Sequence, residues 1–235
     1  MDKRKAQLIV ALDVGTLTEA KKLIKALSRD VEIFKVGSQL FTLCGPQIVR
    51  DLLKAGKKVF LDLKFHDIPN TVANAVEAAV GLKHRDKTIF MCTLHTQGGK
   101  EMLQRAVEAA AKASQAAGVK RPLLLGITVL TSDAKEDSIG NLVLERALLA
   151  KEAGLDGVVA SSQEAAMIRQ RLGDDFIIVT PGIRPAGAEA GDQKRVTTPA
   201  QAQANGSDFL VVGRPVVKAE NPSRAATMIL EELDR

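Results

Sequence analysis

Hydrophobic positions along the chain fall into two kinds of segment that alternate. Strands that are buried on both faces, as in parallel sheets, are apolar throughout instead of alternating between apolar and polar residues. Short runs of this kind, rich in Val, Ile and Leu, occur at 7–13, 32–37, 58–65, 88–95, 123–130, 157–161, 176–182 and 209–215. These runs are therefore predicted to be strands of a parallel sheet.

The segments between these runs have helical periodicity. Residues 17–28 place their apolar side chains on one face of a helix. Residues 45–56 carry Pro near the start and Gly at the end, which is common helix punctuation. The other predicted helices are 71–82, 99–118, 141–154, 162–173, 198–206 and 221–233.

About eight strand-then-helix units with short links predict an α/β fold, a TIM (β/α)8 barrel of parallel strands. An open, doubly wound sheet is the alternative, but it usually has fewer strands and a Gly-rich loop after the first one. The first run here continues as ALDVGTLTEA and lacks the GxGxxG fingerprint. No linker, low-complexity tract or break in composition divides the sequence, so residues 1–235 are predicted to form a single domain.

Composition narrows the function classes. Aromatic residues make up 3% of the chain, with no Trp or Tyr, which argues against nucleic-acid modules that stack bases on aromatic side chains. The net charge of +5 is spread along the chain, which indicates a solvated surface and is compatible with a small anionic substrate. No apolar stretch approaches the roughly 18 residues of a membrane span, and no signal-peptide pattern is present. We therefore expect a cytoplasmic protein with no membrane or nucleic-acid partner.

The cysteines and histidines give no metal signature. Cys44 and Cys92 are the only cysteines, and Cys92 lies in an apolar run that predicts a buried structural thiol. His66, His84 and His95 show no metal-ligand spacing. His95 ends a predicted strand and is a candidate neighbour of a site there.

Polar residues gather near the carboxyl ends of the predicted strands, where the active sites of such barrels lie. This distribution favours one shared pocket over a random scatter. The residues concerned are Asp13, Lys35, Asp62, Lys64, Asp67, His95, Thr131, Ser132, Arg184 and Arg214.

The stretch LDLKFHDIPNT carries the densest group of charges. Asp62 and Lys64 are two residues apart on one strand, so both side chains are predicted to point into the barrel. A lysine beside carboxylates stays protonated and would serve as a cation and an acid. The alternative is an ion-pair network that only fixes the barrel, but buried pairs are a weak route to stability.

A second group of polar residues follows strands seven and eight, where this architecture often binds phosphate. Gly213 and Arg214 offer backbone N–H groups and a guanidinium that suit a phosphate. The preceding loop, 183–195, is rich in Gly and Ala, and carries Arg184 and Gln193. It is predicted to be a mobile lid, with a plain surface loop as the alternative.

DLKFHDIPNT resembles the DxKxxDIxxT signature of the orotidine 5′-monophosphate decarboxylase family. The segments ALD, FKVG, TVLTS, TPGIR, GDQKR and VVGRP follow in that family's order and spacing. The similarity covers nearly the whole chain and is closest to the short bacterial form. It implies a homodimeric barrel without cofactor or metal that converts orotidine 5′-monophosphate to uridine 5′-monophosphate and carbon dioxide, the last step of de novo pyrimidine nucleotide synthesis.

The resemblance also implies roles for individual residues. Lys64 would protonate C6 of the pyrimidine, and Asp62 would share a network of alternating charges with Lys35 and Lys64. Asp67 and Thr71 would reach the active site of the partner subunit. The other implied contacts are Asp13 and Lys35 with the ribose hydroxyls, Thr131 with the pyrimidine edge, and Arg184, Gln193, Gly213 and Arg214 with the phosphate side, Gln193 also near the base.

Two other functions fit part of the pattern. Related barrels that act on keto-sugar phosphates share a similar DxKxxD but hold Mg²⁺, often through an acidic residue on strand two. Here that strand carries Lys35, while Glu32 lies at its start. A non-catalytic phosphate- or nucleotide-binding barrel would explain Gly213, Arg214 and the lid, but not a lysine flanked by two aspartates.

Overall fold

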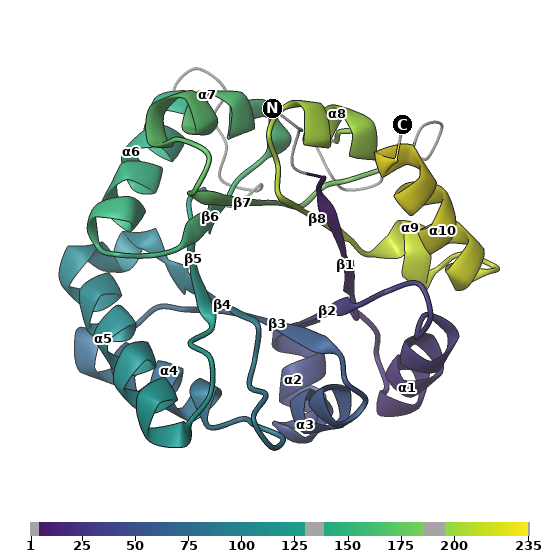
Figure 1. The fold of residues 1–235 in the computed structure, drawn as a ribbon, viewed down its shortest axis with the longest axis horizontal. Coiled ribbons are helices and arrows are strands. Elements are labelled where there is room, and N and C mark those ends of the chain that lie inside the picture. Colours follow the sequence, from purple (N-terminus) through teal and green to yellow (C-terminus); the bar gives the residue numbers. More distant parts are fainter. Residues whose placement is uncertain (1–4, 130–138, 186–195, 235) are drawn as a thin grey trace.

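The computed structural model of the protein describes residues 5–129, 139–185 and 196–234. Its strands are all parallel and form a closed barrel in sequence order, with β8 pairing with β1. Helices surround the barrel on its outer side (Figure 1). The predicted TIM barrel is confirmed, and the open-sheet alternative is wrong.

Each predicted apolar run contains one strand, but most strands are shorter than the run. Asp13 was predicted to end the first strand and instead lies two residues beyond it, in the loop. The strands are β1 (Gln7–Ala11), β2 (Ile33–Gly37), β3 (Lys58–Phe65), β4 (Met91–His95), β5 (Leu123–Ile127), β6 (Gly157–Val159), β7 (Ile177–Thr180) and β8 (Phe209–Val212).

The described helices include three short ones that the sequence pattern did not predict: α2 (Ser38–Cys44), α9 (Arg214–Val217) and the 3₁₀ helix η1 (Thr96–Gly98). Gly45, with a φ of 60°, and Pro46 lie between α2 and α3, so the helix predicted at 45–56 begins only at Gln47. None of the described helices is long and apolar enough to cross a membrane. They are α1 (Leu17–Ala26), α2 (Ser38–Cys44), α3 (Gln47–Lys54), α4 (Pro69–Val80), α5 (Gly99–Ala117), α6 (Ile139–Glu152), α7 (Ser162–Leu172), α8 (Pro199–Ala204), α9 (Arg214–Val217), α10 (Pro222–Leu233) and the 3₁₀ helix η1 (Thr96–Gly98).

The apolar core has two parts, one inside the barrel and one between the strands and the helices. Side chains alternate along each strand, so Phe60 belongs to the inner cluster and Leu61 to the outer one. Two residues beyond Ile33 and Phe60, the inward positions are taken by Lys35 and Asp62. The inner core therefore fills the amino-terminal part of the barrel and leaves its carboxyl end to polar side chains.

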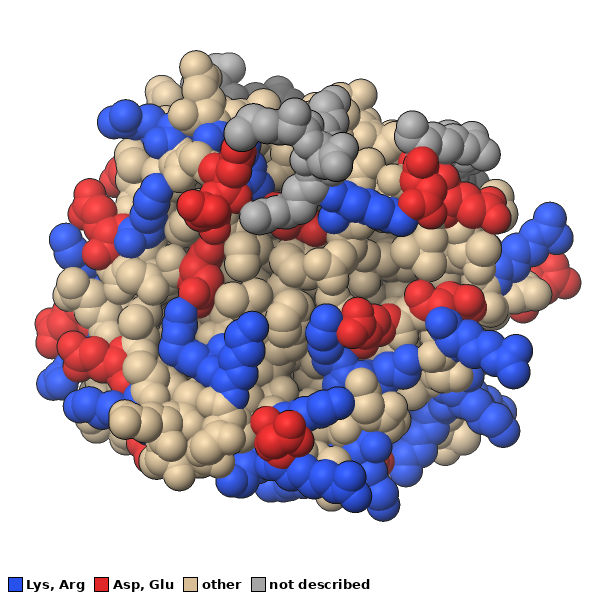
Figure 2. Space-filling model, viewed as in Figure 1, with Lys and Arg blue, Asp and Glu red and all other residues tan. Residues whose placement is uncertain are grey.

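Charged side chains of both signs cover the end of the barrel that Figure 2 shows, with Lys and Arg most frequent in the lower half of the view. Some of the lysines and arginines of the chain are paired: Lys58 with Glu32 at 3.0 Å and Arg121 with Asp156 at 2.5 Å. The exposed pair of Lys58 and Glu32 adds little stability, whereas Arg121 and Asp156 are partly buried. Both pairs agree with a solvated surface of mixed charge.

Candidate active site

A cavity of about 500 Å³ opens at the carboxyl ends of the strands, a size typical of small-molecule sites. Seven of the predicted site residues line it together with apolar residues of β1, β3, β5, β6 and β8. Its described lining has five cations and two carboxylates, so the cavity suits an anionic ligand. The charged and glycine residues are Asp13, Lys35, Asp62, Lys64, Gly182, Arg184, Gly213, Arg214 and Lys218.

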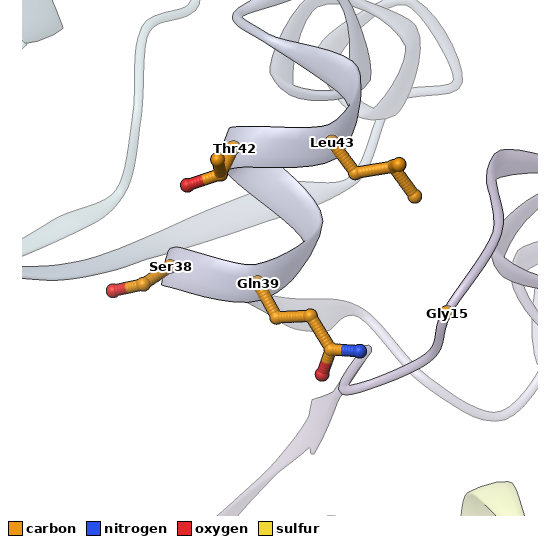
Figure 3. A pocket seen from close by; sticks show the side chains of 5 residues that line it. All are labelled: Gly15, Ser38, Gln39, Thr42 and Leu43. Carbon is orange, nitrogen blue, oxygen red and sulfur yellow. The ribbon is translucent and has the colours of Figure 1, made fainter.

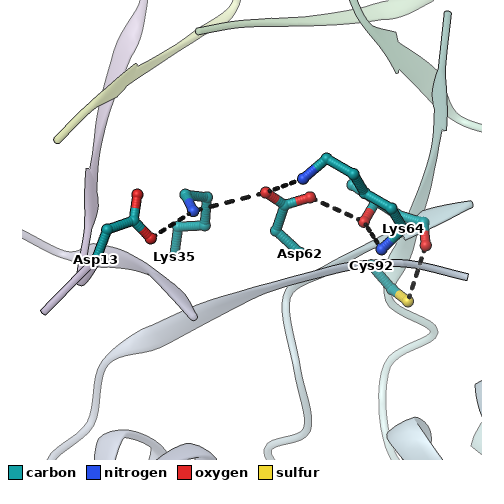
Figure 4. Close-up of polar contacts among 6 residues, drawn as sticks. Asp13, Lys35, Asp62, Lys64 and Cys92 are labelled. Carbon is teal, nitrogen blue, oxygen red and sulfur yellow. Dashed lines mark hydrogen bonds and ion pairs between the residues drawn. The ribbon is translucent and has the colours of Figure 1, made fainter. Parts of the chain in front are cut away.

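Four side chains of alternating charge cross the floor of this cavity: Asp13, Lys35, Asp62 and Lys64 (Figure 4). Lys35 Nζ lies 2.9 Å from Asp13 Oδ1 and 3.6 Å from Asp62 Oδ2. Lys64 Nζ lies 2.8 Å from the same Asp62 Oδ2. Below, these four residues are called the charge chain.

Burial makes the charge chain interdependent. Lys35 is 9% exposed and Asp62 is 8% exposed, and each has charges of opposite sign on both sides. Removing one inner member would leave a buried charge poorly compensated, which is costly. The side chain of Lys64, at the end of the chain, is 39% exposed and faces the cavity. Of the two cations in the charge chain, Lys64 is therefore the one more open to a ligand, since the side chain of Lys35 is only 11% exposed.

Gly37, the last residue of β2, lies beside the contact between Lys35 and Asp13. A Cβ at this position would lie 3.0 Å from Lys35 Nζ and 3.3 Å from Asp13 Oδ1. Any larger residue would push these two groups, so the glycine leaves room for the charge chain.

The backbone at Lys64 departs from a regular strand. Its φ is 51°, in the left-handed region that residues other than glycine rarely adopt. The pairing of β3 with β4 also shifts between Leu61 and Phe65. Asp62 and Lys64 are in contact, as predicted. The alternation of side chains along a regular strand does not fully explain this contact, because the strand is bulged between Leu61 and Phe65.

Thr93 is a residue of this site that sequence reasoning missed. It is fully buried, accepts a hydrogen bond from the Lys64 N–H at 2.9 Å and donates one to Asp62 Oδ1 at 3.0 Å. The only signal in the sequence was a threonine inside the apolar run TIFMCTLH. Its neighbour Cys92 is buried, as predicted, and burial together with the nearby Asp62 carboxylate raises the pKa of the thiol to about 12.

The part of the cavity wall that is formed by residues following β7 and β8 is cationic. Arg184 follows β7 and is 8% exposed, while Gly213 and Arg214 come directly after β8. A Cβ at Gly213 would lie 3.9 Å from Asp13 Oδ2, so this wall adjoins the charge chain. Lys218 was not predicted, although it lies four residues after Arg214, a spacing that puts both on one side of a helical turn.

Two predicted site residues lie away from the cavity of this chain. Asp67 precedes α4, Thr71 is in its first turn, and both are exposed. Between them Ile68 exposes 66% of its surface, unusual for a large apolar residue. Two others, Thr131 and Gln193, and most of the predicted lid lie outside the described residues.

Two of the three histidines, His66 and His95, contact each other. His95 is 7% exposed, accepts a hydrogen bond from the Gln97 N–H at its Nδ1, and stacks on His66 with ring centroids 5.2 Å apart. Within the described ranges, no three His, Cys, Asp or Glu side chains gather in a way that could hold a metal ion.

A second hollow, of about 640 Å³, lies beside the first turn of α2 and the loop that follows β1 (Figure 3). Gly15, Ser38, Gln39, Thr42 and Leu43 line it. None of these side chains is charged. The hollow therefore lacks the groups that would neutralise an anionic ligand, and no predicted site residue lines it.

Comparison with known proteins gives one consistent result. A sequence model of the orotidine 5′-phosphate decarboxylase / HUMPS family matches residues 6–229. The orotidine 5′-phosphate decarboxylase of Syntrophomonas wolfei is 48% identical over 238 residues, covering 97% of this chain and 98% of that protein. The one of Vibrio cholerae is 48% identical over 236 residues, covering 97% and 96%.

Solved structures agree with the sequence comparisons. Orotidine 5′-phosphate decarboxylase from Lactobacillus acidophilus superposes with a TM-score of 0.82 at 36% identity, covering 98% of this chain and 100% of that one. An uncharacterized conserved protein from Geobacillus kaustophilus has a TM-score of 0.81 at 34% identity, covering 96% and 99%.

Proposed function

The chain belongs to the orotidine 5′-phosphate decarboxylase / HUMPS family, and on this premise we propose that it converts orotidine 5′-phosphate to uridine 5′-phosphate and carbon dioxide. The observation that carries the proposal is the half-exposed Lys64 ammonium, fixed by the Asp62 carboxylate in a cavity with an excess of positive charge. The substrate combines a phosphate of charge near −2 with a carboxylate, which matches that excess. The reaction is the last step of pyrimidine nucleotide synthesis.

We propose that the substrate spans the cavity from wall to wall. The phosphate would lie against Arg184, Gly213, Arg214 and the additional cation Lys218, because guanidinium and backbone N–H groups suit phosphate oxygens. The ribose hydroxyls would contact Asp13 and Lys35, and the pyrimidine would lie over Asp62 and Lys64. Thr131 at the pyrimidine edge and Gln193 between base and phosphate complete the proposal.

The proposed chemistry follows from the position of Lys64. The bond between C6 and the carboxylate breaks, its electron pair stays on C6, and carbon dioxide leaves. A fixed ammonium beside C6 stabilises the negative charge as it develops. Its proton then moves from Nζ to C6, and Lys64 regains a proton from solvent. Asp62 holds the ammonium in place through the 2.8 Å contact.

We propose that no metal takes part, on the basis of the groups that are present. Mg²⁺ requires oxygen ligands, usually carboxylates. The space between the Asp13 and Asp62 carboxylates is filled by the Lys35 ammonium, at 2.9 and 3.6 Å. A divalent cation between these acids would have to displace a buried lysine, which argues against the Mg²⁺-dependent function on keto-sugar phosphates.

We propose a homodimer in which Asp67 and Thr71 act in the partner's cavity. Support comes from their exposure and from the exposed Ile68 beside them, since an apolar side chain of this size is usually covered at an interface. Both cysteines are free thiols, as is usual in a reducing compartment, and we propose a cytoplasmic location.

The test is the loss of orotidine 5′-phosphate, followed by ultraviolet absorbance with purified protein, with and without excess EDTA. We expect equal turnover in both samples. Turnover that EDTA abolishes would overturn the metal-free mechanism. No turnover in either sample, combined with tight binding of uridine 5′-phosphate, would favour the non-catalytic binding barrel instead.

A further inference from the structure

The pairing of β3 with β4 is irregular beside the charge chain. Leu61 pairs with Cys92, and the next pair along the two strands joins Phe65 to Leu94. Four steps along β3 therefore match two steps along β4, so β3 holds two extra residues at this point. Because the number is even, Phe65 returns to the outward side of the barrel, where it packs against the outer core.

Thr93 is the single β4 residue opposite this bulge. Its hydroxyl oxygen accepts the Lys64 N–H, which the irregular pairing would otherwise leave without a strand partner. The hydroxyl hydrogen is donated to Asp62 Oδ1, and the other oxygen, Oδ2, contacts the Lys35 and Lys64 ammonium groups. One hydroxyl thus contacts both ends of the bulge.

The two hydrogen bonds of the Thr93 hydroxyl constrain the backbone of Lys64 and the orientation of the Asp62 carboxylate. The hydrogen bond to the N–H holds Lys64 at its φ of 51°, a conformation that is strained for lysine unless its surroundings impose it. The hydrogen bond to Oδ1 sets the plane of the Asp62 carboxylate, so that Oδ2 faces the two ammonium groups. Thr93 has no exposed surface and does not line the cavity, so it acts only through its neighbours.

We propose that Thr93 is a positioning residue, whose hydroxyl sets the backbone of Lys64 and the carboxylate of Asp62 so that the ammonium of Lys64 faces the reacting carbon. The inference rests on the proposed function for its catalytic consequence. Its structural part, control of the bulge by one hydroxyl, stands independently of the substrate.

The decisive variants are Thr93→Val, which keeps the shape and removes the hydroxyl, and Thr93→Ser, which keeps the hydroxyl. Thr96→Val is the matched control, because Thr96 is also a buried threonine, 2% exposed, whose hydroxyl donates to the Ile127 carbonyl at 2.7 Å. It makes no described contact with the charge chain. It therefore reports what the loss of any buried threonine hydroxyl does to stability.

We expect Thr93→Val to lower kcat on the order of 10²-fold, with little change in KM, because a small misplacement of a catalytic group is enough for such a loss. Thr93→Ser should restore kcat to near the wild-type value. Thr96→Val should lower the unfolding midpoint, because it also loses a buried hydrogen bond, and leave kcat unchanged. A kcat for Thr93→Val within twofold of wild type, or equal losses in Thr93→Val and Thr96→Val, would overturn the inference.

A crystal structure of Thr93→Val separates failure of this inference from failure of the proposed function. We expect Lys64 to leave the left-handed region and its contact with Asp62 to lengthen in Thr93→Val but not in Thr96→Val. An unchanged Lys64 would refute the positioning role, whatever the substrate is. Wild-type protein without activity on orotidine 5′-phosphate would refute the proposed function, and the crystal structures would still decide the role of Thr93.

Discussion

Replacing Lys64 with alanine is expected to lower kcat for orotidine 5′-phosphate by at least on the order of 10⁴-fold, the largest effect of any single substitution. In the proposed mechanism the variant loses both the cation that stabilises charge at C6 and the acid that protonates it, and each contribution alone is large. Binding of uridine 5′-phosphate, which lacks the reacting carboxylate, should change little. Absorbance kinetics and calorimetric titration measure the two quantities.

Lys58→Ala is the matched control, since Lys58 lies at the opposite end of the same strand and pairs with Glu32 outside the cavity. It should retain full activity. Near-wild-type turnover by Lys64→Ala would contradict the assignment of the acid. A comparable loss in Lys58→Ala would show that any lysine lost from β3 disturbs the barrel.

The second large effect is expected when two inactive variants are mixed. Asp67→Ala and Lys64→Ala should each be nearly inactive, but subunit exchange between them should restore activity. A mixed dimer contains one complete site if Asp67 acts across the interface, so random mixing in a symmetric dimer restores about a quarter of the wild-type activity. Activity is measured after co-expression of the two variants.

The control mixture combines Lys64→Ala with Asp62→Ala. Asp62 and Lys64 line the same cavity of one chain, 2.8 Å apart, so no mixed dimer can contain a complete site and no activity should return. Failure of the Asp67 mixture to regain activity, in dimers shown to have exchanged, would refute the role of Asp67 across the interface. Recovery of activity in the control mixture would show that mixing restores activity without a site shared between subunits, so the experiment could not test the role of Asp67.

The barrel and the positions of most site residues followed from the sequence because both depend on local patterns. Continuous apolar runs predict buried parallel strands, and the carboxyl ends of such strands converge, which brings Asp13, Lys35 and Arg214 to one cavity. The contact between Asp62 and Lys64 was also predicted, from their spacing of two residues.

The bulge at Lys64 and the role of Thr93 could not be predicted in the same way. A left-handed lysine has no local signal, because its conformation is imposed by the pairing of β3 with β4, which is a contact between distant residues. Thr93 reads in the sequence as part of a strand core. The pattern of one chain also does not say whether Asp67 and Ile68 are covered in an assembly, because the proposed interface depends on contacts between two chains.

The most direct test of the central claim is a crystal structure with uridine 5′-phosphate, the proposed product. We expect the phosphate to lie against Gly213 and Arg214, and C6 of the pyrimidine to lie beside Lys64 Nζ at the end of the charge chain. A nucleotide bound in the reverse direction, with its base at Arg214, would contradict the account. So would a nucleotide bound only in the uncharged hollow beside α2.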